Sequence, residues 1–284
     1  MFQNIKRGWE IGKATRKLVF QEKNLMIYPI ISGIAILAEI LAIFIPSLLL
    51  IGTSLQYYYI LPLFLFYFVV TFTATYILMA MFIAFRSVTA GNKITMSQAF
   101  SQVKPYTKLV IEWSLFYSVI IMIIRLIESR MRGISGIILG AVLSMAIGFA
   151  TIFVVPVILD EKLTPIKAMK RSASFIIKNF GKSFGGLLYT DLYSLAIVLI
   201  GIVIGLVGIF VSTNTYVTIS LLLVGGIILF IGIIINYLLS NVFKLIVYDF
   251  INHSKVPKGF SKEILSNAAK NKISHNNFMQ PPSN

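Results

Sequence analysis

Six long apolar runs, separated by short connections of very uneven charge, constrain this chain more than any other feature. The runs cover about 28–52, 57–85, 109–127, 133–158, 187–211 and 217–249. Each can cross a hydrocarbon core of about 30 Å as a helix that rises 1.5 Å per residue. We therefore expect an all-α, polytopic membrane protein with six transmembrane helices.

The composition agrees with a chain that lies mostly inside a bilayer. Of its 284 residues, 57% are hydrophobic and only 12% are charged, which is far less charge than a soluble domain of this length carries. We expect one membrane domain over 1–251 and a polar, flexible cytoplasmic tail over 252–284. The chain has no cysteine, so disulfide and thiolate chemistry are excluded.

The positive charges predict the topology. All but three of the 25 Lys and Arg residues lie in the N-terminal segment, the second and fourth connections, or the end of the last span and the tail. Since positive residues mark the cytoplasmic face, we expect a cell-membrane protein with both termini in the cytoplasm. The net charge of +15 is spread over four membrane-adjacent segments, which argues against a nucleic-acid partner.

The opposite side of the predicted membrane has only short turns. They cover 53–56, 128–132 and 212–216, and the remaining three arginines, Arg125, Arg130 and Arg132, lie in or near the middle turn. Such short connections predict that neighbouring spans pair as three helical hairpins.

The cytoplasmic connection at 159–186 has the pattern of a basic amphipathic helix. Thr164 suits its N-cap and Pro165 its first helical position. Its apolar stripe consists of Ile166, Met169, Ala173, Ile176 and Phe180, and its basic face contains Lys167, Lys170, Arg171 and Lys178. We expect this helix to lie in the interface with its cations toward anionic headgroups. The alternative is a solubilising loop that only sets the topology.

Two further segments repeat this design. Residues 95–104 and the basic N-terminal segment show similar stripes, and the stretch after Gly91 aligns weakly with the stretch after Asp160. The chain can therefore be read as three units, near 1–85, 86–158 and 159–251, each an interfacial helix followed by a hairpin.

Small residues recur at four-residue spacing in two of the spans. The fourth span contains Gly136, Gly140, Ser144 and Gly148, and the fifth contains Gly201 and Gly205. Small residues at this spacing let a neighbouring helix backbone approach closely. They predict helix packing within the chain, and they leave open a homo-oligomer or a protein partner.

Glu39 is the most costly polar residue of the first span, because it lies near the predicted bilayer midplane. Folding the first hairpin about residue 55 places Glu39 level with Thr71, and Thr75 shares that face. We expect the carboxyl group to face the bundle interior near one of these hydroxyls. Two interpretations stay open: an ion or proton site, and a protonated packing residue.

The other intramembrane polar residues are expected nearer the cytoplasmic interface. They are Glu112, Asp191, Asn236 and Lys244. The register of the last hairpin places Asp191 beside Asn236 and Ser240, with Lys244 a turn or two lower. Interface anchoring or structural pairing is the default interpretation for these groups.

The sequence gives little support for catalysis. Its two histidines, His253 and His275, lie at the C-terminal end, and no metal-ligand cluster, nucleophile motif or phosphate loop is present. We therefore expect no cofactor, no bound metal and no enzymatic activity.

Several residues resemble those of a known family. Trp9, Tyr28-Pro29, Trp113 and, above all, Thr151 to Glu161 followed by Pro165, Ala168 and Lys170-Arg171-Ser172 are similar to a family of six-span integral membrane proteins of bacteria and archaea. That family is a domain of unknown function. The resemblance implies the same fold and membrane location, and it brings no substrate or catalytic residue.

Two functional hypotheses follow. The first is a non-enzymatic membrane protein that binds lipids or partner proteins through its basic face. The second is a transporter or channel for a small solute or ion that uses Glu39.

Overall fold

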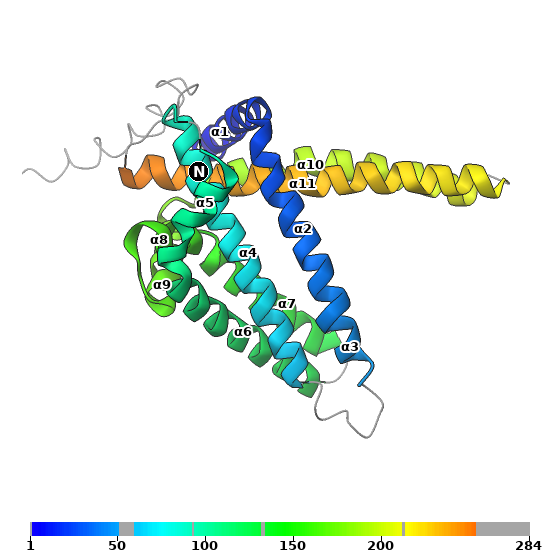
Figure 1. Ribbon diagram of the computed structural model, residues 1–284, viewed down its shortest axis with the longest axis horizontal. Coiled ribbons are helices and arrows are strands. Elements are labelled where there is room, and N and C mark those ends of the chain that lie inside the picture. The colour runs from blue at the N-terminus through cyan, green and yellow to red at the C-terminus, as the bar shows by residue number, and fades with distance from the viewer. Residues whose placement is uncertain (1, 51–59, 93, 132–133, 212–213, 254–284) are drawn as a thin grey trace, which may run out of the picture. The chain divides into compact units, whose positions relative to one another are not determined.

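The computed structural model describes residues 2–50, 60–92, 94–131, 134–211 and 214–253, and every regular element in them is helical (Figure 1). The α-helices are α1 (Phe2–Gln21), α2 (Ile27–Glu39), α3 (Ile45–Leu48), α4 (Ile60–Thr89), α5 (Met96–Val103), α6 (Thr107–Arg130), α7 (Ile134–Thr151), α8 (Val154–Glu161), α9 (Pro165–Lys178), α10 (Phe180–Phe210) and α11 (Thr215–His253). Short 3₁₀ helices cover Lys23–Met26 and Lys104–Tyr106, and a π-helix covers Ile40–Phe44.

Within the described residues, six helical stretches are long and apolar enough to cross a membrane. They are Asn24–Leu48, Ile60–Thr89, Met96–Arg130, Ile134–Glu161, Ser183–Phe210 and Thr215–His253. Each overlaps one of the predicted spans. The third stretch is much longer than the predicted 109–127, because α5, the 3₁₀ turn and α6 follow one another as helix. The predicted tail lies outside the described residues from 254 onward.

The helices form two compact units. One contains α2 to α9, and the other contains α1, α10 and α11. The expected single domain over 1–251 stays a prediction.

In the unit from α2 to α9, α4 packs against both α2 and α6, and α6 packs against α7. The short helix α5 packs on α4, and α9 packs on α7 and α8. Thr95 caps α5: its hydroxyl accepts from the backbone amide of Gln98, and the Gln98 side chain accepts from the backbone amide of Thr95. This reciprocal pair satisfies two amides that the first helical turn leaves without partners.

The predicted fourth span, 133–158, is not one continuous helix. It breaks after Thr151, and α8 begins at Val154. Pro156 explains the break, because it has no N–H to donate to the carbonyl of Ile152 and its ring would collide with that carbonyl. The amide of Phe153, at the break, donates instead to the hydroxyl of Ser172 in α9, over 2.9 Å.

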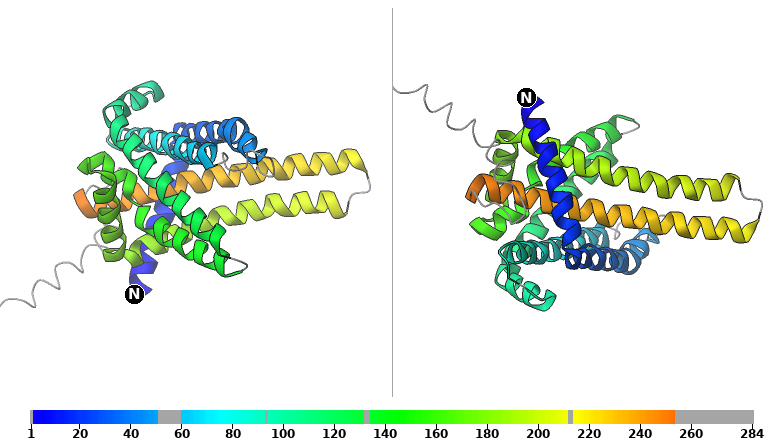
Figure 2. Two further views of the ribbon diagram at one scale, coloured as in Figure 1. Left: turned by 90° about the horizontal axis from the view of Figure 1, so that it is seen from below. Right: turned by 90° about the horizontal axis from the view of Figure 1, so that it is seen from above.

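The other unit is a long hairpin with a helix across one end. Both views of Figure 2 show α10 and α11 side by side, with α1 crossing them. At 39 residues α11 is about 58 Å long, well beyond one membrane crossing. Its C-terminal part, from Leu238 to Asp249, is buried, and α11 packs against both α10 and α1.

Glycines determine where α1 crosses α10. A methyl group at Gly185 would overlap the carbonyl of Ile5, and one at Gly186 would overlap the ring of Phe243. On the α1 side, a Cβ at Gly12 would lie 2.9 Å from the Tyr189 ring. The backbones approach as closely as they do because these side chains are missing.

Two of the three amphipathic helices, α5 and α9, pack against the hairpin that precedes them in the chain. Helix α5 packs on the first hairpin and α9 on the second, while α1, which has no preceding hairpin, packs on the last. Each amphipathic helix therefore packs on the hairpin of a predicted repeat unit other than its own.

Candidate functional site

Helix α9 presents three distinct faces. The buried face, which packs on its own unit, contains Ala168, Ser172, Phe175 and Ile176. A second face is apolar and uncovered: Ile166 is 53% exposed and Ile177 is 75% exposed. The third is the predicted basic face, whose members Lys167, Lys170, Arg171 and Lys178 are all exposed. An uncovered apolar strip beside a basic strip is the pattern of a helix at a membrane surface.

The predicted stripe of α9 therefore needs one correction. Ile176 is buried, but Ile166 is exposed, and Phe180 belongs to α10 rather than to α9. Ala168 and Ser172 lie on the buried face, where the Ser172 hydroxyl accepts from the Phe153 amide. Most of the predicted stripe consequently flanks the packed face.

The tertiary contacts of α9 fix its orientation. The rings of Phe153 and Phe175 lie 4.6 Å apart between centroids, and the Ser172 hydroxyl accepts from the Phe153 amide. At the surface, Nε of Arg171 lies 2.9 Å from Oε1 of Glu161. The Glu161 carboxylate thus partly neutralises Arg171, so the three lysines supply most of the unbalanced positive charge of this face.

Helix α1 has a second basic face. Lys6, Lys13 and Lys17 are exposed on one side, while Ile11 and Val19 on the opposite side are buried in the unit with α10 and α11. The aromatic residues of α10 hold the flank of α1: Arg16 lies over the ring of Tyr193 at 4.7 Å, and Trp9 meets Tyr189 edge-on at 4.9 Å between centroids. These contacts with α10 therefore hold α1, and with it the exposed lysines, in a defined orientation.

Glu39 pairs with a threonine of α4, but not with either predicted one. The hydroxyl of Thr73 donates to its Oε1 over 2.6 Å. The prediction of Thr71 or Thr75 assumed regular helices in both arms of the hairpin. The π-helix at Ile40–Phe44 adds a residue to one turn directly after Glu39, so the α-helical register does not extend through the hairpin.

The second carboxyl oxygen of Glu39 is unusual. Among the described residues, Oε2 is buried and has no hydrogen-bond partner. A buried polar oxygen without a hydrogen-bond partner is costly in that setting. The neighbouring π-helix ends just before Pro46, whose missing N–H disturbs the regular hydrogen-bond ladder.

The α10–α11 hairpin contains a second polar cluster. Oδ1 of Asp191 accepts from the side chain of Asn236 over 3.0 Å and from Ser240 over 3.1 Å. This is the arrangement that the hairpin register predicts. Lys244 lies one turn after Ser240 along α11, and it donates to Oδ1 of Asn241 over 3.3 Å rather than to Asp191. Glu112, in α6, is half-buried and lies in the other unit.

Not all of the predicted small residues lie where another helix approaches closely. Gly136 and Gly140 are buried against the end of α6, and a Cβ at Gly201 would lie 2.6 Å from the carbonyl of Gly225. Gly205 has room for a Cβ, and Gly148 has open space around it. Ser144 is half-buried. Four-residue spacing alone therefore marks more positions than the fold uses.

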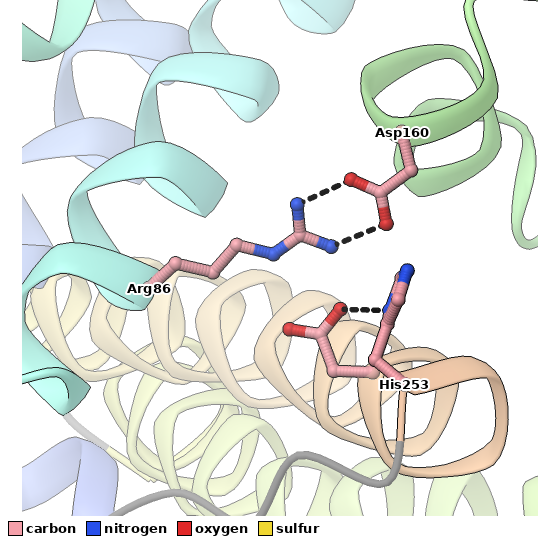
Figure 3. Close-up of polar contacts among 4 residues, drawn as sticks. Arg86, Asp160 and His253 are labelled. Atoms are coloured by element: carbon pink, nitrogen blue, oxygen red, sulfur yellow. Dashed lines mark hydrogen bonds and ion pairs between the residues drawn. The ribbon is translucent and has the colours of Figure 1, made fainter.

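Arg86 and Asp160 form a pair that no sequence pattern indicates. The guanidinium of Arg86, in α4, meets the carboxylate of Asp160, in α8, through two hydrogen bonds of 2.5 and 2.9 Å (Figure 3). The two residues are 74 positions apart, and no local spacing links them. The pair joins α4 of the first predicted hairpin to α8, at the end of the second, within one unit.

Together, the six membrane-length helices and the polar contacts between them define a multi-pass α-helical membrane protein. Its residues 55–258 match the model of a family of unknown function (DUF6159), and the chain belongs to that family. This confirms the resemblance noted in the sequence. No curated protein and no solved structure matches the chain.

Proposed function

We propose that this protein is a non-enzymatic, lipid-binding organiser of the cell membrane whose termini lie in the cytoplasm. The observation that carries the proposal is α9, which shows an exposed apolar strip beside four exposed basic residues. Each lysine near an anionic surface contributes about 1 kcal/mol, and the apolar strip adds burial in the headgroup region. Helix α1 offers a second basic face of the same kind, so two fixed helices would contact anionic headgroups.

The test neutralises the lysines of α9 and leaves Arg171 in its pair with Glu161. We expect a variant with Lys167, Lys170 and Lys178 changed to Gln to lose most of its enrichment of anionic lipid. The measurement is mass spectrometry of lipids retained by protein purified from nanodiscs of equal anionic and zwitterionic content. A second variant, Ile166→Ser with Ile177→Ser, should weaken retention of both lipid classes.

The matched control changes Lys255, Lys258 and Lys262 to Gln, which lowers the net charge equally outside α9. Anionic enrichment should then stay close to that of the unaltered protein. Equal losses in both triple variants would show that net charge, and not α9, attracts the lipid. Unchanged enrichment in the α9 variant would contradict the proposal.

A second candidate function is favoured by Glu39. A membrane carboxyl group with one oxygen bonded to Thr73 and the other buried without a partner could take up a proton or an ion during transport. The chain has no cysteine, so Glu39→Cys would introduce a unique label site. Fast reaction with a small hydrophilic thiol reagent in intact membranes would favour transport. No reaction, with Ser54→Cys reacting as the accessible control, would favour the lipid-binding function.

A further inference from the structure

A cavity of about 390 Å³ opens where α6 ends and α7 begins. Its lining combines one cation, one anion, two larger apolar side chains and small residues. These residues are Arg125, Glu128, Met131, Gly136, Ile137, Ala141 and Ser144. The cavity lies toward the N-terminal end of α7, whereas α9 packs near its C-terminal end, at Phe153. It is thus separate from the basic face of α9.

Glycines create the space that the charged pair occupies. A methyl group at Gly140 would overlap the carboxyl group of Glu128, and a Cβ at Gly136 would lie 2.9 Å from the carbonyl of Met131. The Glu128 side chain therefore rests against the bare backbone of α7. Its side chain is 21% exposed, so the carboxylate borders the cavity from a partly covered position.

Arg125 and Glu128 share fewer hydrogen bonds than Arg86 and Asp160 do. The Arg125 guanidinium also bonds to the side chain of Tyr67 in α4. One hydrogen bond of 2.6 Å joins Nη1 of Arg125 to Oε2 of Glu128, and the Arg125 side chain is 52% exposed. A guanidinium has five N–H donors and a carboxylate has about four acceptor positions. The pair thus offers a ligand both donors and acceptors, at zero net charge.

We infer that this cavity binds the zwitterionic headgroup of an aminophospholipid. The phosphate would meet the guanidinium of Arg125, which suits phosphate geometry, and the primary ammonium would donate to the carboxylate of Glu128. Ile137, which is 71% exposed, would lie along the lipid chain. A purely anionic headgroup is opposed by Glu128, and a purely cationic one by Arg125. On the proposed orientation this lipid sits in the leaflet opposite to α9.

The test measures lipid selectivity of the full-length protein in nanodiscs of equal phosphatidylethanolamine, phosphatidylcholine and phosphatidylglycerol. Native mass spectrometry should show retained phosphatidylethanolamine. We expect Glu128→Gln to lower its preference over phosphatidylcholine about tenfold, because a quaternary ammonium cannot donate the hydrogen bond that distinguishes the two lipids. Ala141→Phe, which fills the cavity, should remove retention of the lipid altogether.

Two controls keep the outcome interpretable if a variant folds poorly. Met145→Phe adds the same ring to α7 outside the cavity, and Arg130→Gln removes a cation near Arg125 that does not line it. Both should retain phosphatidylethanolamine. Equal retention in Ala141→Phe and Met145→Phe would overturn the inference, as would a preference for phosphatidylglycerol. Displacement of the lipid by soluble phosphoethanolamine at low concentration would contradict the inference that the ligand is a lipid. The acyl chains would then contribute nothing to binding.

Discussion

The backbone amide of Phe153 donates a hydrogen bond of 2.9 Å to the hydroxyl of Ser172, and both groups are buried. This bond joins the break in the fourth span to the basic helix α9. It replaces the intrahelical bond that the break near Pro156 removes, and it orients α9 so that its lysines face outward.

Replacing Ser172 with Ala should destabilise the protein by about 1–3 kcal/mol, because the Phe153 amide would be buried without a partner. The measurement is the thermal unfolding of purified protein in detergent. Ser174→Ala, on the half-buried flank of the same helix, is the control and should change the unfolding midpoint little. Equal midpoints for the two variants would mean that the Phe153 bond is unimportant.

Adding a side chain where α1 crosses α10 should separate the two helices. Gly185→Ala places a methyl group onto the carbonyl of Ile5, and such overpacking costs about 1–3 kcal/mol. We expect faster proteolysis within α1, measured by limited digestion in membranes. Gly226→Ala is the matched control, because open space surrounds a Cβ at that position of α11. Similar digestion of both variants would count against the crossing.

Replacing one member of the Arg86–Asp160 pair should lower the free energy of unfolding more than replacing both members. Arg86→Gln or Asp160→Asn alone leaves a half-buried charge, with an expected loss of about 1–3 kcal/mol. The double variant should recover part of this loss, since the second charge of the pair is then removed as well. A double-mutant cycle of unfolding free energies gives the coupling. A coupling energy near zero would show that the two residues are independent.

The Asp191 cluster should stabilise the last hairpin. Asn236→Leu removes one donor to Asp191 and leaves Ser240 as the remaining one, so we expect a loss of about 1 kcal/mol. Ile233→Leu, an exposed position of α11 one turn earlier, should have little effect. The measurement compares the thermal unfolding midpoints of the two variants with that of the unaltered protein. An unchanged midpoint for Asn236→Leu would show that the bond to Asp191 does not stabilise the hairpin.

Some contacts of the candidate sites follow from the sequence because they are local. Thr95 and Gln98 are three residues apart, so helical geometry alone brings their groups together. Asp191 and Asn236 are far apart in the chain, yet two regular helices and a short turn fix their register. Glu39 shows the limit of this reasoning, because the π-helix beside it shifts the register that the prediction assumed.

The sequence by itself determined the six apolar spans and the amphipathic character of α1, α5 and α9, because apolar length and helical periodicity act over a few residues. Tertiary structure alone decided which surfaces meet: α1 with Gly185 of α10, Ser172 with Phe153, and Arg86 with Asp160. The helices are similarly apolar, and lipid provides no hydrophobic force that selects one neighbour over another. Partner choice therefore rests on close fit and on polar groups that need partners, and both emerge only when distant segments pack together.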